Sequence, residues 1–93
     1  MSKFELGKVV VTEKINARMK EDKNFDIFIK TSLGRFKNCD WGILCAEDKA
    51  AVDEAVTSGG MMIMGAYKHK DEEIWIITEW DRSVTTILFP HER

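Results

Sequence analysis

Two carboxylates close together in the sequence, Glu79 and Asp81, are the first candidates for chemistry in this chain. Residues two apart in a strand point to the same side of it, so this pair could hold a metal ion or carry out acid–base work. Asp71, Glu72 and Glu73 precede the same strand and could join them. A charged hairpin end that prevents edge-to-edge aggregation explains the five acids more simply. We therefore expect no metal, no cofactor and no catalytic residue.

The remaining reactive side chains do not form a recognisable active site. Ser83 has no histidine at a useful spacing and is typical of a turn, while His69 and His91 lie in segments that we expect to be solvated. Cys39 and Cys45 lack the two-residue spacing of zinc knuckles and redox pairs, so we expect free thiols. The sequence has no glycine-rich phosphate loop and no interleaving of basic with aromatic residues. We predict a protein that is not an enzyme and does not bind nucleic acid directly.

Charge divides the chain into a basic and an acidic part. Residues 1–37 carry nine bases and five acids, a net charge of +4, whereas residues 38–93 carry five bases and eleven acids, a net charge of −6. Between residues 40 and 81, ten acids and three lysines give −7 over 42 residues. Such an excess could present a negative field to a basic partner, or it could be a solvated face that only keeps the protein soluble.

The elements that would position these acids are organised around residues 74–90, the densest run of β-branched and aromatic residues in the chain. The polar residues 81–83 divide this run into the two strands of a predicted β-hairpin, and Pro90 ends the second strand. A strand that is apolar on both faces lies in mid-sheet or is covered by helices on one side and by a partner on the other. The bulky residues of the first strand are Ile74, Ile76 and Trp80 on one face, and Trp75 and Ile77 on the other.

Before this hairpin, the pattern predicts a strand followed by two helices. Residues 8–12 form a short β-branched strand, and a short helix follows through Met19. Asn24 is the expected cap of a second helix, residues 25–36, in which Gly34 weakens the helix and marks its end. The apolar stripe that packs this helix on a sheet consists of Phe25, Phe28, Ile29, Leu33 and Phe36, with Ile27 outside it.

A third helix and a buried strand are predicted between these helices and the hairpin. Residues 46–57 have helical periodicity, and the glycines at 59 and 60 end the helix. Residues 61–67 are apolar on both faces and form a strand, and residues 68–73 form a charged hairpin loop. In the third helix Ala51, Val52, Ala55 and Val56 point inward, and Glu47, Asp53 and Glu54 point outward.

The order of elements, β-α-α-α-β-β-β, predicts an α+β fold. We expect residues 1–93 to form a single globular domain, with a three- to four-stranded antiparallel sheet and about three helices packed on one face. No apolar run approaches the roughly 18–20 residues that span a bilayer, and the N-terminal residues do not resemble a signal peptide. We therefore expect a cytoplasmic protein that does not bind a membrane.

Several segments carry a resemblance that covers nearly the whole chain: Phe4–Thr12, Lys37–Gly42, Leu44–Cys45, Glu47–Ala50, Ala66–His69, Ile74–Ser83 and Thr85–Pro90. They resemble a family of small proteins of plasmids, phages and integrative elements, whose members often carry the label plasmid-related protein or type I restriction subunit M. A chain of 93 residues is too short for a methyltransferase fold. The chain is also similar to anti-CRISPR proteins that act on the type I-C system, which are compact α/β proteins regarded as DNA mimics.

This resemblance implies a counter-defence protein, a monomer or homodimer that inhibits a type I CRISPR surveillance complex stoichiometrically in the host cytoplasm. Its acidic surface would occupy a basic surface of the complex, where duplex DNA places phosphates about 3.4 Å apart along each strand. One alternative is a homo-oligomeric accessory protein that uses its two-sided sheet as a dimer interface. Another is a small metal-dependent hydrolase that uses Glu79 and Asp81. The predicted partner contacts are Glu47, Asp53, Glu54, Asp71, Glu72, Glu73, Glu79 and Asp81, with either Trp75 or the methionine run over residues 61–64 as an apolar anchor.

Overall fold

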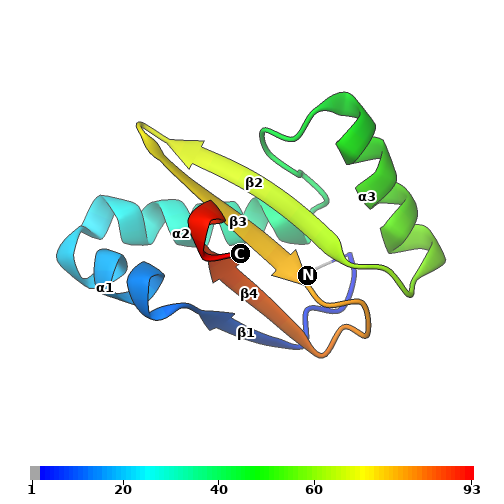
Figure 1. Cartoon of the computed structure of the whole chain (residues 1–93), viewed down its shortest axis with the longest axis horizontal. Helices are drawn as coiled ribbons and strands as arrows, with labels where there is room; N and C mark the ends of the chain where they lie inside the picture. The colour runs from blue at the N-terminus through cyan, green and yellow to red at the C-terminus, as the bar shows by residue number, and fades with distance from the viewer. Residues whose placement is uncertain (1–2) are drawn as a thin grey trace.

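The computed structural model describes residues 3–93 and confirms the predicted α+β class and order of elements. Three helices separate the first strand from three consecutive strands at the C-terminal end of the chain (Figure 1). The elements are β1 (Lys8–Val11), α1 (Glu13–Glu21), α2 (Lys23–Lys37), α3 (Ala46–Ser58), β2 (Ile63–His69), β3 (Glu72–Thr78), β4 (Val84–Leu88) and a short 3-10 helix, η1 (Pro90–Glu92).

The four strands form one sheet in the order β1-β4-β3-β2. β2, β3 and β4 pair antiparallel, as predicted, because short loops join them. β1 instead runs parallel to β4, with Lys8 opposite Val84 and Val11 opposite Ile87, so the expectation of a purely antiparallel sheet is wrong for this strand. Three helices separate β1 from β2 in the chain, and no tight turn fixes the direction of β1.

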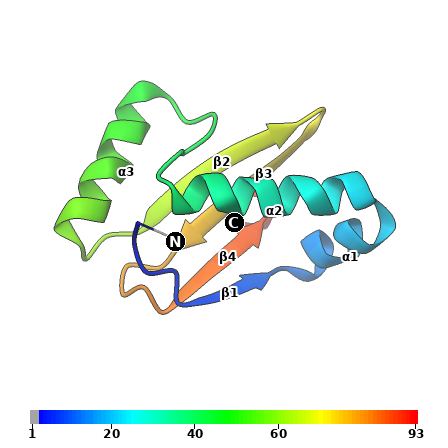
Figure 2. The same ribbon diagram turned by 180° about the vertical axis from the view of Figure 1, so that it is seen from behind.

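Helix α2 lies across one face of the sheet (Figure 2). Its predicted apolar stripe is confirmed, since Phe25, Ile29 and Phe36 are buried, and Ile27 outside the stripe is exposed. α1 packs beside α2, and α3 lies next to the edge strand β2. The side chains that fill the space between helices and sheet include Ile15, Phe25, Ile29, Phe36, Trp41, Ala55, Ile63, Tyr67, Ile74, Ile76 and Ile87.

Helix α2 is longer than predicted at both ends. Asp22, not Asn24, is its N-cap, and an Asp22 carboxylate oxygen accepts hydrogen bonds of 2.9 Å from the Asn24 N–H and 3.4 Å from the Phe25 N–H. The expected polar break between α1 and α2 is therefore a single residue. The helix also continues through Gly34 to Lys37, because burial of the aromatic stripe outweighs the cost of about 1 kcal/mol for a helical glycine.

Both hairpin connections differ from the prediction. The expected loop over residues 68–73 is a turn at Lys70 and Asp71, with Lys70 in the left-handed region (φ 56°), because the flanking residues continue the strands. His69, expected to be solvated, stacks on Phe28 with ring centroids 5.3 Å apart. β3 ends at Thr78, so Trp80 leaves the sheet and its side chain is 63% exposed instead of sharing the buried face of Ile74.

The second face of the sheet is also apolar and is covered in part by the C-terminal end of the chain. Ile77 is buried on this face, and Trp75 is half-buried. Helix η1 lies over this face and contacts β3 (Figure 1). Glu92 holds η1 in place, because its carboxylate accepts hydrogen bonds of 2.9 Å from the Thr12 hydroxyl and from the Phe89 N–H.

Candidate functional site

The outer side of α3 carries carboxylates that make no ion pair within residues 3–93. The helix packs on the core through Ala55, and Glu47, Asp48 and Glu54 are exposed. Two of these acids lie in the first turn, where the helix dipole favours negative charge. The predicted outward orientation of Glu47 and Glu54 is therefore confirmed, and their role in binding a partner stays a prediction.

Asp53, the third acid predicted to face outward on α3, has a structural partner. Its carboxylate accepts a hydrogen bond of 2.8 Å from the indole N–H of Trp41, whose side chain is buried. Trp41 belongs to a short segment that pairs with the edge of the sheet: the Ala66 N–H donates to the Trp41 carbonyl, and the Ile43 N–H donates to the Ala66 carbonyl. Asp53 thus helps to attach α3 to the sheet.

The acids near the β2–β3 turn are largely engaged in contacts within the molecule. Glu72 accepts two hydrogen bonds, of 2.8 and 2.6 Å, from the guanidinium of Arg18 on α1. Glu73 accepts a hydrogen bond of 2.9 Å from the indole N–H of Trp75. Asp71 is exposed in the β2–β3 turn. This turn lies at the opposite end of β2 from the loop that joins α3 to β2 (Figure 1). At about 3.3 Å per residue, the length of β2 places the β2–β3 turn roughly 20 Å from the loop that joins α3 to β2.

Glu79 and Asp81 do not share a strand face, because β3 ends before Glu79. The Asp81 carboxylate accepts hydrogen bonds of 2.6 Å from the Ser83 hydroxyl and 3.0 Å from the Ser83 N–H, and these bonds hold the pKa of Asp81 below its ordinary value. Within residues 3–93, no three His, Cys, Asp or Glu side chains come together in a way that could hold a metal ion. Asp81 therefore shapes the β3–β4 turn.

Arg82 connects the β3–β4 turn to two other parts of the molecule. It has a left-handed backbone conformation (φ 60°), and its guanidinium donates hydrogen bonds to the carbonyl oxygens of Met61 (2.6 Å), Trp80 (3.0 Å) and Ala55 (3.2 Å). From sequence alone, Arg82 belongs only to the predicted turn over residues 81–83. A lone arginine in a turn gives no sequence signal that would reveal these distant acceptors.

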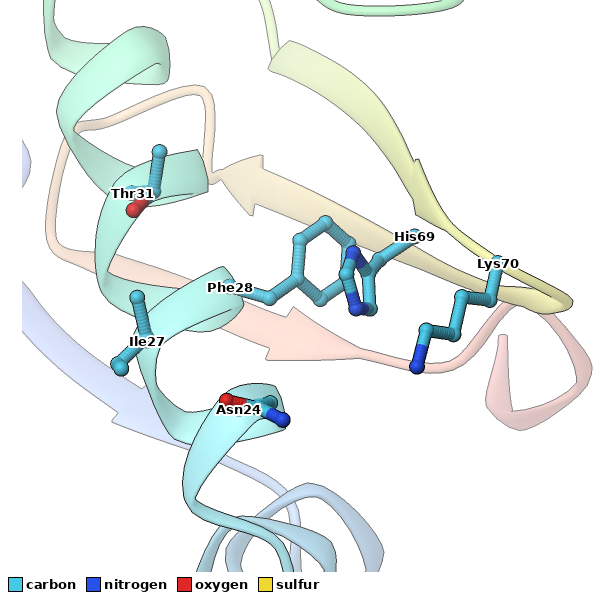
Figure 3. Close-up of a pocket in the computed structure, with 6 residues that line it drawn as sticks. All are labelled: Asn24, Ile27, Phe28, Thr31, His69 and Lys70. Atoms are coloured by element: carbon cyan, nitrogen blue, oxygen red, sulfur yellow. The ribbon is translucent and has the colours of Figure 1, made fainter.

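Among residues 3–93, two of the surface hollows border β2. One, of about 280 Å³, lies between α3 and β2 and has Asp48 as its only charged lining residue. The other, of about 350 Å³, lies between α2 and the end of β2 and includes the stacked rings of Phe28 and His69 (Figure 3). Ile27, which is 53% exposed, and Lys70 also line this second hollow, so one hollow carries a carboxylate and the other a cation.

Comparisons of this chain with protein-family models, with curated proteins and with solved structures find no match. Among the described residues, none of the helices combines the length and the apolar character needed to cross a bilayer.

Proposed function

We propose that this protein is a stoichiometric inhibitor that occupies a basic, DNA-binding surface of a host complex, and that a type I CRISPR surveillance complex is the target. The observation that carries the proposal is the row of exposed carboxylates on α3, which make no ion pair within residues 3–93. Carboxylates without an internal partner are free to meet lysine and arginine side chains of another molecule. Their long-range field also speeds encounter with a basic surface.

The spacing of two of these acids supports a likeness to DNA. Glu47 and Glu54 are seven residues apart and lie on one side of α3. At 1.5 Å per residue they are separated by roughly 10 Å along the helix axis, which is about three steps of the 3.4 Å phosphate spacing of one DNA strand. Ala51, which was expected to point inward, is exposed like Ala50, and both side chains are small, so a basic surface can approach the helix closely.

The proposed contact surface is smaller than the sequence alone indicates. Asp53, Glu72 and Asp81 hold parts of the fold together, so changing them would alter stability as well as charge. We therefore assign the contact to Glu47, Asp48 and Glu54 on α3. Asp71 lies in the turn that follows the C-terminal end of β2 and serves as a comparison.

Charge reversal on α3 tests this proposal. The double variant Glu47→Lys with Glu54→Lys should lose binding to a purified type I surveillance complex and should no longer compete with target DNA. The wild-type affinity should also weaken as salt is added, because ion pairs with DNA-binding residues are screened. The measurements are a titration of the complex and a DNA competition assay.

A matched control makes this test specific. The double variant Glu5→Lys with Asp71→Lys changes the net charge by the same amount at exposed positions outside α3. It should inhibit like the wild type. Full inhibition by the α3 variant, or equal loss in both variants, would refute the assignment to α3. Self-association in light scattering without any effect on the complex would favour the homo-oligomeric accessory protein instead.

A further inference from the structure

The hollow between α3 and β2 is lined mainly by apolar side chains. We name it the methionine groove and define it by Leu44, Asp48, Ala51, Val52, Met62 and Met64. Unbranched methionine side chains are flexible and polarizable, and for this reason they adapt to varied apolar partners. Met62 is 41% exposed. The groove therefore offers an apolar surface that the described part of the chain leaves open to solvent.

Two exposed apolar residues outside the groove share a hydrogen-bond donor. Met61 is 56% exposed and Trp80 is 63% exposed, and Arg82 donates hydrogen bonds to the carbonyl oxygens of both residues. This guanidinium therefore links the backbone of the residue before Met62 to the β3–β4 turn. Tryptophan, methionine and arginine are enriched at protein–protein interfaces, where a buried aromatic anchor often dominates the affinity.

The charge around the groove determines which kind of partner the groove attracts. Asp48 lines the groove, and α3 as a whole carries four acids and one lysine, a net charge of −3. A nucleic acid or an acidic peptide would be repelled by this helix, whereas lysine or arginine side chains would be attracted. The cation-lined hollow beside α2 has the opposite character.

We propose that the methionine groove binds an apolar side chain of a basic polypeptide segment, whose flanking lysine or arginine residues pair with the acids of α3. The inference rests on the proposed function and specifies the partner surface: an apolar side chain bordered by basic residues. The groove also provides a specificity that the acids of α3 alone do not. Burial of one apolar side chain distinguishes a protein segment from other cationic surfaces.

The probe is a short synthetic lysine-rich peptide with one central leucine. Its binding is measured by NMR of the full-length protein with labelled methionine methyl groups. The methyl signals of Met62 and Met64 should shift, and that of Met19 on α1 should not. Replacing the leucine by serine should weaken binding about tenfold or more, the loss expected when a leucine side chain is no longer buried. A glutamate-rich peptide with the same leucine should not bind.

Matched protein variants locate the site. Met62→Ser should weaken binding of the leucine peptide about tenfold, whereas Ile27→Ser, which alters a similarly exposed apolar residue in the other hollow, should have no effect. Both positions are exposed, so both variants should retain the wild-type amide spectrum. The inference would be overturned by any of three results: no methyl shifts, equal affinity for the leucine and serine peptides, or methyl shifts that appear when only the protein concentration is raised.

These results can be separated from those on the proposed function. If the peptide binds the groove but the wild-type protein does not inhibit the surveillance complex, the proposed function fails and the groove remains a binding site. If Glu47→Lys with Glu54→Lys still inhibits, only the assignment of the inhibitory contact to α3 fails. If that double variant abolishes inhibition but the peptide does not bind, the inference about the groove is wrong and the acidic contact stands.

Discussion

At the scale of single residues, Asp53 and Glu54 are neighbours in sequence with different surroundings. Asp53 accepts a hydrogen bond from the buried indole of Trp41, and Glu54 makes no ion pair within residues 3–93. Helical periodicity placed both on the outer side of α3, because the direction of a side chain follows from its position in the helix. Periodicity does not specify which carboxylate meets a donor from another segment. Of these two neighbours, therefore, only Glu54 is suited to a charge-reversal test.

Asp53 provides the first prediction at this scale. Asp53→Ala should lower the free energy of unfolding by about 1–3 kcal/mol, because it leaves the buried Trp41 N–H without an acceptor. Asp53→Asn retains an acceptor oxygen and should cost less than about 1 kcal/mol. Urea denaturation of both variants gives the comparison. Equal losses would show that the carboxylate charge, and not the hydrogen bond, is what matters.

A second prediction at this scale concerns the pH dependence of stability. The Arg35 guanidinium donates hydrogen bonds of 2.8 and 3.2 Å to Asp40 and holds the pKa of this carboxyl below its ordinary value, although partial burial opposes the shift. Because the folded-state pKa is below the unfolded one, about 3.9, the stabilisation is fully present above that value and is lost as the pH falls through the folded-state pKa.

Arg35→Met isolates the contribution of this ion pair. Methionine removes the charge and can keep an apolar contact with the ring of Tyr67, over which the guanidinium lies at 5.2 Å. The variant should lose less stability than the wild type between pH 5 and pH 3, as followed by thermal unfolding at several pH values. Other carboxyls whose pKa is lowered, such as Asp81, act in both proteins. Identical acid profiles would contradict the assignment to Asp40.

At the scale of elements, α2 is determined mainly by its buried stripe. Asp22 caps its first turn, and Phe25, Ile29 and Phe36 pack it on the sheet. The glycine at position 34 does not end the helix, because propensity is a weak effect beside the burial of large apolar side chains. α3 is different, since Ala55 is its only fully buried residue and most of its surface faces solvent.

Gly34 therefore offers a stabilising substitution within α2. No neighbouring atom outside the helix lies within 4 Å of a Cβ added at this position, so Gly34→Ala should raise the free energy of unfolding by about 0.5–1 kcal/mol. Gly7→Ala is the contrasting control. Gly7 has φ 64°, and its Cβ would collide with the carbonyl oxygens of Arg82 and Ser83, so that variant should be destabilised. Chemical denaturation measures both effects, and destabilisation by Gly34→Ala would contradict the prediction.

At the scale of the whole molecule, Arg82 holds together segments that are distant in the sequence. Its guanidinium donates hydrogen bonds to the β3–β4 turn, to the C-terminal part of α3 and to the segment just before β2. The methionine groove lies between α3 and β2, the two elements that Arg82 joins to the turn. The geometry of the proposed contact surface therefore depends on a residue that is not itself assigned to the contact.

Arg82→Ala should lower the free energy of unfolding by about 2 kcal/mol, because the hydrogen bonds that its charged guanidinium donates to the carbonyl groups of Met61, Trp80 and Ala55 are lost. Alanine keeps the Cβ, so the cost of the left-handed backbone does not change. Arg93→Ala removes a single exposed contact to Met62 and should change stability by less than about 0.5 kcal/mol. Urea denaturation compares the two, and a small loss in both would show that the Arg82 contacts contribute little.

The sequence by itself determined the local structure and part of the surface. The β-branched run predicted the C-terminal hairpin, the spacing of Phe25, Ile29 and Phe36 predicted the buried side of α2, and the glycines at 59 and 60 predicted the end of α3. Helical periodicity also placed Glu47 on the outer side of its helix. These features follow from sequence because they depend on residues only a few positions apart.

Only the tertiary structure decided how distant segments meet. It placed β1 parallel to β4, left Trp80 outside the sheet, and paired Glu72 with Arg18, a residue 54 positions earlier in the chain. It also separated the acids into those that hold the fold and those that face solvent, and it formed the methionine groove from α3 and β2. Ion pairs, hydrogen bonds to buried donors and grooves all require two surfaces that come together only when the chain packs, so no periodicity within one segment can reveal them.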